Sequence, residues 1–282
     1  MNHKPALVFQ TDFGYKETSV SAMYGVIKNV DSDLELIEAS HELPQFDIWS
    51  ASYRLFQQMR FWPQGTIFVS VVDPGVGTSR RACVALTENG YYIVTPDNGS
   101  LTHVLRHHGI RQVRQIDETI NRLHNAGTDE TVVFHGRDLF GYCAARLGAG
   151  IITYEEVGPE YPVSEIVTFD IPEPEETENG YIGIIEIDDT NFGNLFTNIP
   201  TKGLLKKCPY GSLVHVTVRE KGELRFSEDV RFDLTFGKVN PGDPIVYNNE
   251  QMKAGLAVSV GSFVKKYGIG FGPDWTVEIN TI

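Results

Sequence analysis

The chain has 282 residues, of which 41% are hydrophobic and 22% charged, so we expect a folded globular protein of one large or two modest domains. Its 24 basic against 37 acidic residues give a formal net charge of −13. This balance argues against a nucleic-acid or anionic-membrane partner, because phosphate groups are bound by clustered Lys and Arg. Three widely spaced cysteines and the lack of a long apolar run indicate a soluble protein of the reducing cytoplasm.

Strand-like and helical patterns alternate through the first half of the chain. Apolar runs and turn signals predict strands at 6–10, 34–37, 66–72, 81–86, 91–95 and 131–134. Apolar residues at helical spacing predict helices at 20–30, 48–59 and 136–147, and Asp47 is placed to cap the second of these. Because strands and helices alternate, residues 1–170 are predicted to form an α/β domain with a largely parallel sheet.

The character of the sequence changes at residue 171. Segment 171–180 is acidic, contains two prolines and lacks periodicity, so we interpret it as a linker. No long helix is indicated after it. Short strands separated by turn signals are predicted at 181–187, 212–218, 230–234, 244–247 and 256–260. Residues 181–282 are therefore predicted to form a smaller β-barrel or sandwich domain.

Polar motifs follow several predicted strands of the first half. Asp12 follows the first strand, and a compact Pro-Gly turn separates Asp73 from Arg80 after the third. Ligands of open α/β sheets bind beyond the carboxyl ends of strands, so Asp12 is placed to hold a ribose diol. His135, beside an acid and an arginine from a neighbouring strand end, is a candidate acid/base group. Each motif has a structural alternative: an Asp-Gly turn, a turn followed by solvated arginines, and a structural histidine.

A further motif, Asp188 to Asn198, combines acids, amides and aromatic residues around a glycine. A flat heterocycle needs ring faces to stack on and an amide to read its edge, and this composition supplies both. By contrast, the Pro96 to Ser100 segment is interpreted as a structural turn that leads into a helix.

Together these segments resemble the S-adenosyl-L-methionine (SAM) hydroxide adenosyltransferase family. The resemblance rests on five motifs in order: Thr-Asp-Phe-Gly, Val-Val-Asp-Pro-Gly-Val-Gly-Thr-Ser-Arg-Arg, Pro-Asp-Asn-Gly-Ser-Leu, Phe-His-Gly-Arg-Asp and Asp-x-x-Phe-Gly-Asn-x-x-Thr-Asn-Ile. Members hydrolyse SAM to adenosine and methionine and are relatives of the SAM-dependent fluorinase and chlorinase. The resemblance implies an N-terminal α/β domain, a C-terminal β-barrel, and a homotrimer that binds SAM between neighbouring subunits.

The resemblance also implies roles for individual residues. The family's triad that positions the attacking water falls on Asp73, Arg80 and His135. The residues expected to bind SAM are Asp12 at the ribose, Asp189 at the methionine amino group, Asn194 and the backbone of Val260 at the adenine, and the stacking aromatics Phe192 and Phe196. The halogenases lack the triad, so its presence favours water over halide as the nucleophile. The sequence leaves open whether the aspartate or the histidine of the triad takes the proton.

One position departs from the family pattern. Glu250 stands where the family usually has a serine, and an extra carboxylate there can help to hold an ammonium or sulfonium charge. No metal or redox cofactor is implied, since SAM is itself the substrate.

Three alternatives to a SAM hydrolase stay open at this point. A halogenase of the same fold would depend on chloride or fluoride, and a non-catalytic SAM or adenosine-binding protein would bind without turnover. A metal-dependent phosphoesterase would be sensitive to chelators. Its two-metal site could be drawn from Asp12, Asp73, Asp97, Asn98 and His135.

Overall fold

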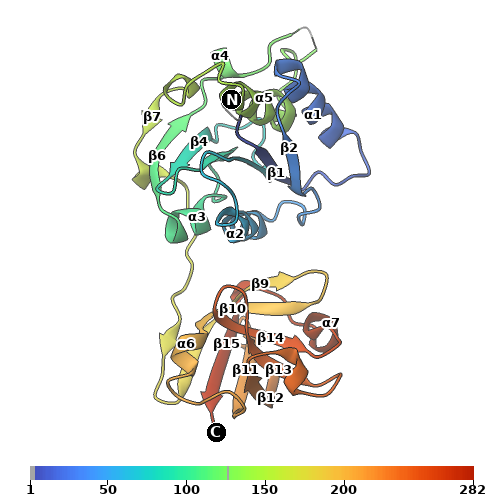
Figure 1. Cartoon of the computed structure of the whole chain (residues 1–282), viewed down its shortest axis with the longest axis vertical. Coiled ribbons are helices and arrows are strands. Elements are labelled where there is room, and N and C mark those ends of the chain that lie inside the picture. Colours follow the sequence, from blue (N-terminus) through green and yellow to red (C-terminus); the bar gives the residue numbers. More distant parts are fainter. Residues whose placement is uncertain (1–3, 126) are drawn as a thin grey trace. The chain divides into compact units, whose positions relative to one another are not determined.

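The computed structural model describes residues 4–125 and 127–282. The chain divides into two compact units, Met1–Phe169 (unit 1) and Asp170–Ile282 (unit 2), each with its own sheet (Figure 1). In the described part of the chain, no helix has both the length and the apolar character needed to cross a bilayer.

Unit 1 is built on a seven-stranded sheet with the order β2-β1-β3-β5-β4-β6-β7. The strands are β1 Leu7–Thr11, β2 Leu36–Ser40, β3 Ile67–Val71, β4 Ala82–Thr87, β5 Tyr92–Pro96, β6 Ile110–Gln115 and β7 Glu160–Tyr161. The pairings β2–β1, β1–β3 and β3–β5 are parallel, and the remaining three are antiparallel. All strands except β4 and β7 consequently point the same way. The predicted α/β unit with a largely parallel sheet is confirmed.

Helices pack their apolar faces onto this sheet. The helices of unit 1 are α1 Ser19–Val30, α2 Ile48–Met59, α3 Thr102–His107, α4 Glu118–Asn121 and α5 Tyr142–Gly148, with short 3₁₀ turns η2 Glu155–Val157 and η3 Val163–Glu165. The predicted cap of α2 is confirmed, because the Asp47 side chain accepts a hydrogen bond from the Ser50 N–H at 2.9 Å. Met23 and Ile27 of α1 join Leu7 of β1 in the core.

The strand predicted at 131–134 is wrong. These residues are irregular, and His135 leads directly into a π-helical segment, η1 Gly136–Gly141, which continues as α5. The β-branched pair Val132 and Val133 suggested a strand, yet the two side chains are 49% and 72% exposed and pair with no neighbouring strand. His135 therefore does not follow a strand end. It lies at the start of an unusual helical turn of a kind that is frequent at functional sites.

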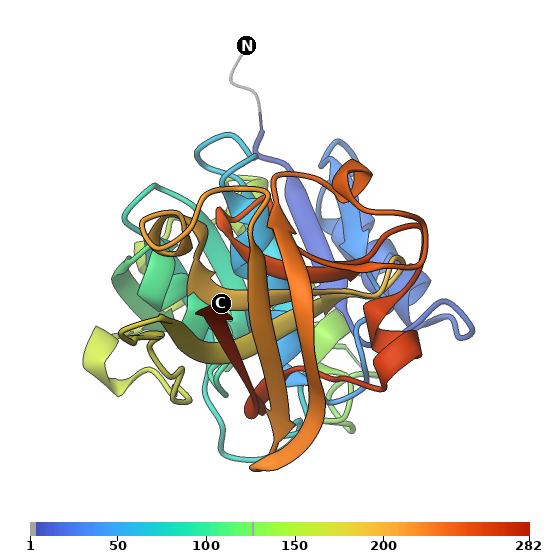
Figure 2. The ribbon, with the colours of Figure 1, turned by 90° about the horizontal axis from the view of Figure 1, so that it is seen from below.

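Unit 2 is a closed barrel, which confirms the predicted β-barrel over the sandwich. Its strands are β8 Glu175–Glu176, β9 Gly180–Asp189, β10 Asn194–Pro200, β11 Leu213–Glu220, β12 Glu223–Asp233, β13 Pro244–Asn248, β14 Lys253–Val258 and β15 Gly272–Thr281. The order β10-β14-β13-β12-β11-β15-β9 closes through a β9–β10 pairing, and β8 joins β9 outside the ring. Figure 2 shows the long β11–β12 hairpin, in orange, curving across the unit. The helices of unit 2 are short: α6 Thr201–Leu204, α7 Phe263–Tyr267 and the 3₁₀ turn η4 Phe236–Lys238.

The structure adds details that the sequence did not predict. Strands β10 and β15 were not expected, and the strand expected at 256–260 begins earlier and ends at Val258. Within the segment interpreted as a linker, β8 pairs with β9. The polar residues that obscured β10 are satisfied inside the barrel: the Thr197 hydroxyl donates to the Ala254 carbonyl at 2.7 Å.

Candidate active site

The carboxyl ends of β1 and β3 lie side by side in the sheet of unit 1. Thr11 pairs with Val71, so the residues that follow these strands, including Asp12 and Asp73, emerge at the same edge. A cavity of about 290 Å³ lies beyond them and is lined by both aspartates and by His135. We call it the strand-end cavity. Its position is the one expected for ligands of open α/β sheets.

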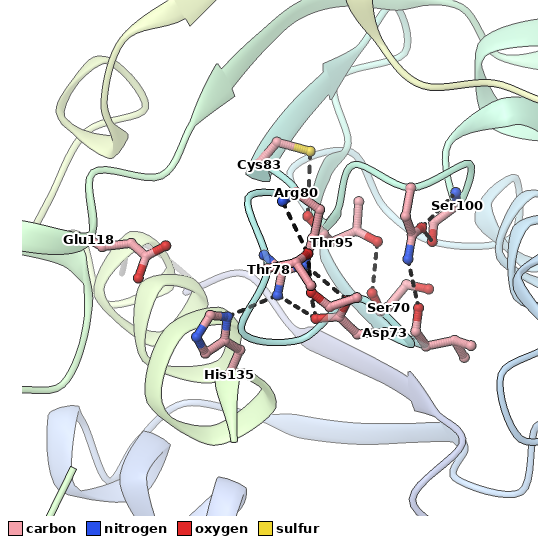
Figure 3. Close-up of polar contacts among 12 residues, drawn as sticks. Ser70, Asp73, Thr78, Arg80, Cys83, Thr95, Ser100, Glu118 and His135 are labelled. Atoms are coloured by element: carbon pink, nitrogen blue, oxygen red, sulfur yellow. Dashed lines mark hydrogen bonds and ion pairs between the residues drawn. The ribbon is translucent and has the colours of Figure 1, made fainter. Parts of the chain in front are cut away.

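Arg80 joins Asp73 to His135, two of the residues that line this cavity (Figure 3). The Arg80 Nε donates to Asp73 Oδ1 at 2.9 Å and to Oδ2 at 3.0 Å, and Nη2 also contacts Oδ2. The same Nη2 lies 2.9 Å from His135 Nδ1. The Arg80 and Asp73 side chains are only 9% and 6% exposed, so water screens this ion pair weakly. The structure thus links the three predicted triad residues through Arg80, which contacts both of the others.

The hydrogen bond from Arg80 fixes the tautomer of His135. A guanidinium can only donate, so Nδ1 accepts and the proton of the neutral ring lies on Nε2. Burial and the neighbouring Arg80 charge lower the pKa of His135 below its ordinary value, which keeps the ring neutral. Its Nε2 is buried and has no hydrogen-bond partner among the described residues. This N–H is therefore left as a donor.

A tight turn that contains two glycines brings Arg80 back into contact with Asp73. Gly77 has φ +76°, a left-handed conformation that favours glycine, and a Cβ on Gly75 would lie 3.2 Å from Arg80 Cγ. On its other side, the guanidinium lies over the Phe140 ring, 5.1 Å from the centroid. The arginine is thus held from two directions.

Asp12 lies opposite this network in the same cavity. Its Oδ2 accepts the Phe46 N–H at 2.9 Å, while burial raises the pKa of the Asp12 carboxyl. Phe46 itself has φ +64° and is 67% exposed. Close packing continues behind Asp12, where a Cβ on Gly136 would lie 2.5 Å from the Phe13 ring. Asp12 therefore lines the cavity from a closely packed turn.

A second group of predicted residues gathers in unit 2. A cavity of about 530 Å³ is lined by Asp189, Phe192, Asn194 and Phe196. We call it the barrel cavity. These residues come from the β9–β10 hairpin, in which Asp189 pairs with Asn194. Phe192, in the turn, is 69% exposed, whereas Phe196 is buried.

Gly193 allows this hairpin to pack against the start of α7. Its φ is +70°, and a Cβ there would lie 1.9 Å from the Ser262 hydroxyl oxygen. Its carbonyl accepts the Val264 N–H at 3.1 Å. Any other residue would move the turn that carries Phe192.

Aromatic residues that sequence reasoning missed complete the barrel cavity. Tyr247 and Phe236 line it, with ring centroids 4.6 Å apart. Gly255 makes room for the tyrosine, since a Cβ there would lie 2.5 Å from the ring. Burial raises the pKa of Tyr247, so its hydroxyl stays neutral. The sequence held a sign that Tyr247 lies near the site, because this residue ends a predicted strand just before Glu250.

Of the two remaining predicted positions, Glu250 lines the barrel cavity and Val260 does not. Glu250, the departure from the family pattern, lines the barrel cavity together with Asp189. Val260 is not among the residues that line it. Its side chain is 90% exposed and its φ is +52°, in the turn after β14.

Two of the five donors drawn for a two-metal site, Asp97 and Asn98, are engaged elsewhere. Asp97 accepts hydrogen bonds from the Val167 N–H at 2.8 Å and the Tyr161 hydroxyl at 3.0 Å, and it pairs with Arg81. Asn98 donates to the Val72 carbonyl at 3.0 Å. These contacts fit the structural interpretation of the turn. In the described ranges, no three His, Cys, Asp or Glu residues are grouped to hold a metal ion.

An α/β unit with a polar strand-end cavity, followed by a barrel with an aromatic and amide cavity, defines a two-domain class with known relatives. Residues 7–158 match the model of the SAM hydroxide adenosyltransferase N-terminal domain, and residues 182–276 match that of the C-terminal domain. The chain belongs to the SAM hydroxide adenosyltransferase family.

Individual relatives agree with this assignment. The chain is 33% identical to the (R)-S-adenosyl-L-methionine hydrolase of Methanocaldococcus jannaschii, over 76% of this chain and 74% of the relative. It is 31% identical to the protein of the same name from Thermus thermophilus, over 94% and 96%. A fluorinase from an Actinoplanes species is 27% identical over 98% of both chains. An uncharacterized conserved protein from Thermotoga maritima has a crystal structure with a TM-score of 0.86 and 32% identity, covering 97% of this chain and 99% of that one.

Proposed function

We propose that this chain is a SAM hydrolase. Water attacks the ribose C5′, the bond from C5′ to sulfur breaks with its electron pair going to sulfur, and L-methionine leaves as adenosine forms. The observation that carries the proposal is the contact of Asp73, Arg80 and His135 beside Asp12 in the strand-end cavity. The names of the relatives carry the prefix (R), which we interpret as the configuration at sulfur and extend to the substrate of this chain.

The chemistry of the triad follows from the leaving group. A sulfonium departs as a neutral thioether and needs no general acid, whereas water is a very weak acid and must be made a better nucleophile. The Arg80 cation stabilises developing hydroxide character in a site that is largely shielded from solvent. The water proton passes to Asp73, because the Nδ1 of His135 already accepts from Arg80 and its Nε2 carries a proton. His135 then orients the arginine and offers a donor.

The barrel cavity supplies recognition. Asp189 binds the methionine ammonium group, Asn194 reads the adenine edge, and Phe192 and Phe196 give stacking and apolar contact. In the strand-end cavity of unit 1, Asp12 accepts hydrogen bonds from the ribose hydroxyls. The backbone of Val260 also contacts the adenine. This residue lies in an exposed turn, where a ligand can reach it.

The assembly we propose is a homotrimer in which unit 1 of one subunit and unit 2 of its neighbour complete one active site. Both cavities have exposed apolar side chains at their walls, including Phe46, Val133 and Phe192, of a kind that subunit contacts usually cover. Three free, buried cysteines suit a reducing cytoplasm.

One experiment tests the reaction and its rivals together. The purified chain is incubated with each sulfonium epimer of SAM in ¹⁸O-labelled water. The products are then separated by chromatography, and their masses are measured by mass spectrometry. We expect adenosine labelled at the 5′ oxygen, from the R epimer, with or without chelator and in the absence of halide. A 5′-halogenated nucleoside made only with added halide would identify a halogenase. Binding with no product at all would identify a SAM sensor.

A further inference from the structure

Unit 1 contains a second cavity, of about 390 Å³, that no part of the proposed reaction uses. It is lined by Val26, Asn29, Val30, Leu123, Asn125, Tyr142, Arg146 and Ile151. None of these residues lines the strand-end cavity. They come mainly from α1 and α5, which pack side by side (Figure 1). The volume lies within the range of small-molecule sites.

Arg146 is the one charged residue in the lining. Its Nε is buried without a hydrogen-bond partner in the described part of the chain, and none of the ion pairs found there includes Arg146. Its Nη1 approaches the Tyr142 hydroxyl at 3.4 Å, and the guanidinium lies 5.6 Å from the centroid of the same ring. The ring one helical turn earlier therefore holds the cation in place. In a chain of net charge −13, a partly buried arginine without an acidic partner is a local site for an anion.

The rest of the lining divides between amides and aliphatic side chains. Asn125 Oδ1 already accepts the N–H groups of Gly127 at 2.8 Å and Thr128 at 3.1 Å, which leaves the amide NH₂ to donate. Val26, Val30, Leu123 and Ile151 form the apolar wall. A planar guanidinium, amide donors and a short apolar wall complement a carboxylate attached to an aliphatic chain.

We infer that this cavity binds a small aliphatic monocarboxylate, with the carboxylate on Arg146 and the chain against the valine and leucine side chains. A dianionic phosphate would leave charge unpaired against one arginine and would not use the apolar wall. A neutral amide or alcohol of the same shape would leave the guanidinium without its counter-charge.

Isovalerate is a suitable probe, and isovaleramide is its neutral match. Full-length protein labelled at Ile, Leu and Val methyl groups is titrated with each while methyl NMR shifts are recorded. We expect isovalerate to shift the methyls of Leu123 and Ile151, to leave those of Val71 and Val133 in the strand-end cavity unmoved, and to bind at least tenfold more tightly than isovaleramide. Equal affinity for the two probes, or shifts centred on the strand-end cavity, would overturn the inference without any variant being made.

Two variants then test the role of the arginine. Arg146→Gln should weaken isovalerate binding at least tenfold and leave isovaleramide unchanged, since only the charged ligand uses the guanidinium. Arg111→Gln, at an exposed position on β6, makes the same change in net charge and should bind isovalerate like the parent. Parent-like binding of isovalerate by Arg146→Gln would contradict the assignment, as would an equal loss in both variants. Because neither probe is a substrate, these results are independent of whether the chain hydrolyses SAM.

Discussion

The strand-end cavity and the barrel cavity are built on different physical principles. In the first, an ion pair and a neutral imidazole hold one another: Arg80 contacts Asp73 and His135, with Phe140 beneath the guanidinium. In the second, rings and amides on strands and turns form most of the wall, together with the carboxylates of Asp189 and Glu250, and Phe192 is largely exposed. A charged network is organised before a ligand arrives, whereas an exposed aromatic wall gains most of its contacts from the ligand. Chemistry should therefore depend on unit 1 and affinity on unit 2.

The largest expected effect tests that division at Asp73. Asp73→Asn keeps an oxygen that can accept from Arg80 but removes the base, so turnover should fall roughly 10²- to 10⁴-fold. SAM affinity, measured by calorimetry, should change only a few-fold, because the triad faces water rather than the recognition groups. A parallel melting curve separates lost chemistry from lost folding, since Arg80 loses an anionic partner. Turnover within a few-fold of the parent would exclude Asp73 as the base.

The residues of the strand-end cavity could be predicted because the sequence marks strand ends clearly. A buried apolar run that stops at Asp12 or at Asp73 places each carboxylate at the binding edge of a parallel sheet. The same logic failed for His135, because the β-branched run before it resembles a strand but is irregular, and its last residue, Val133, lines the cavity. The tautomer of the histidine depends on a contact across 55 residues and cannot be inferred from local sequence.

The barrel cavity was only half predictable. Asp189 and Asn194 stand in one hairpin, so a single local motif revealed them. Tyr247 reaches the same cavity through β14, where Gly255 pairs with both Tyr247 and Phe196, and Phe236 lies in the turn after β12. Residues gathered by non-local pairing can be found only when the register of the strands is known.

The second prediction sharpens the contrast within unit 2. Asn194→Ala should weaken adenosine and SAM alike, roughly ten- to a hundred-fold, because both ligands present the adenine edge. Asp189→Ala should weaken SAM and spare adenosine, which has no amino-acid end. Calorimetry with both ligands on both variants gives the result. Equal losses of adenosine affinity would show that the two ends of the ligand are assigned the wrong way round.

The third prediction concerns pH and separates positioning from proton transfer. Because the pKa of His135 lies below its ordinary 6.5, acid should reduce turnover with a midpoint below that value, as protonated Nδ1 repels Arg80. The unfolded chain takes up this proton near 6.5, so the contribution to stability is complete above 6.5 and declines as the pH falls toward the lower folded value.

His135→Asn provides the discriminating variant for that profile. Its side-chain oxygen can accept from Arg80 but does not titrate, so the acidic limb due to the histidine should disappear while kcat stays within about tenfold of the parent. His135→Ala, which offers no acceptor, should lose roughly ten- to a hundred-fold. If the asparagine variant is as inactive as the alanine variant, the histidine acts on the proton rather than on the arginine.

The smallest effect is expected at Glu250, a carboxylate that lines the barrel cavity. SAM carries sulfonium and ammonium cations, so a carboxylate in the barrel cavity attracts it without touching the reacting carbon. Glu250→Ser, which introduces the residue usual in the family, should raise KM about two- to fivefold and leave kcat unchanged, as expected for one partly screened charge. Added salt should weaken SAM binding less in this variant than in the parent.

Glu228→Ser, a change at an exposed position on β12, removes the same charge elsewhere and should leave KM unchanged. A fall in kcat at Glu250→Ser would mean that this carboxylate acts on the reaction itself, and the separation of chemistry from recognition between the units would no longer hold.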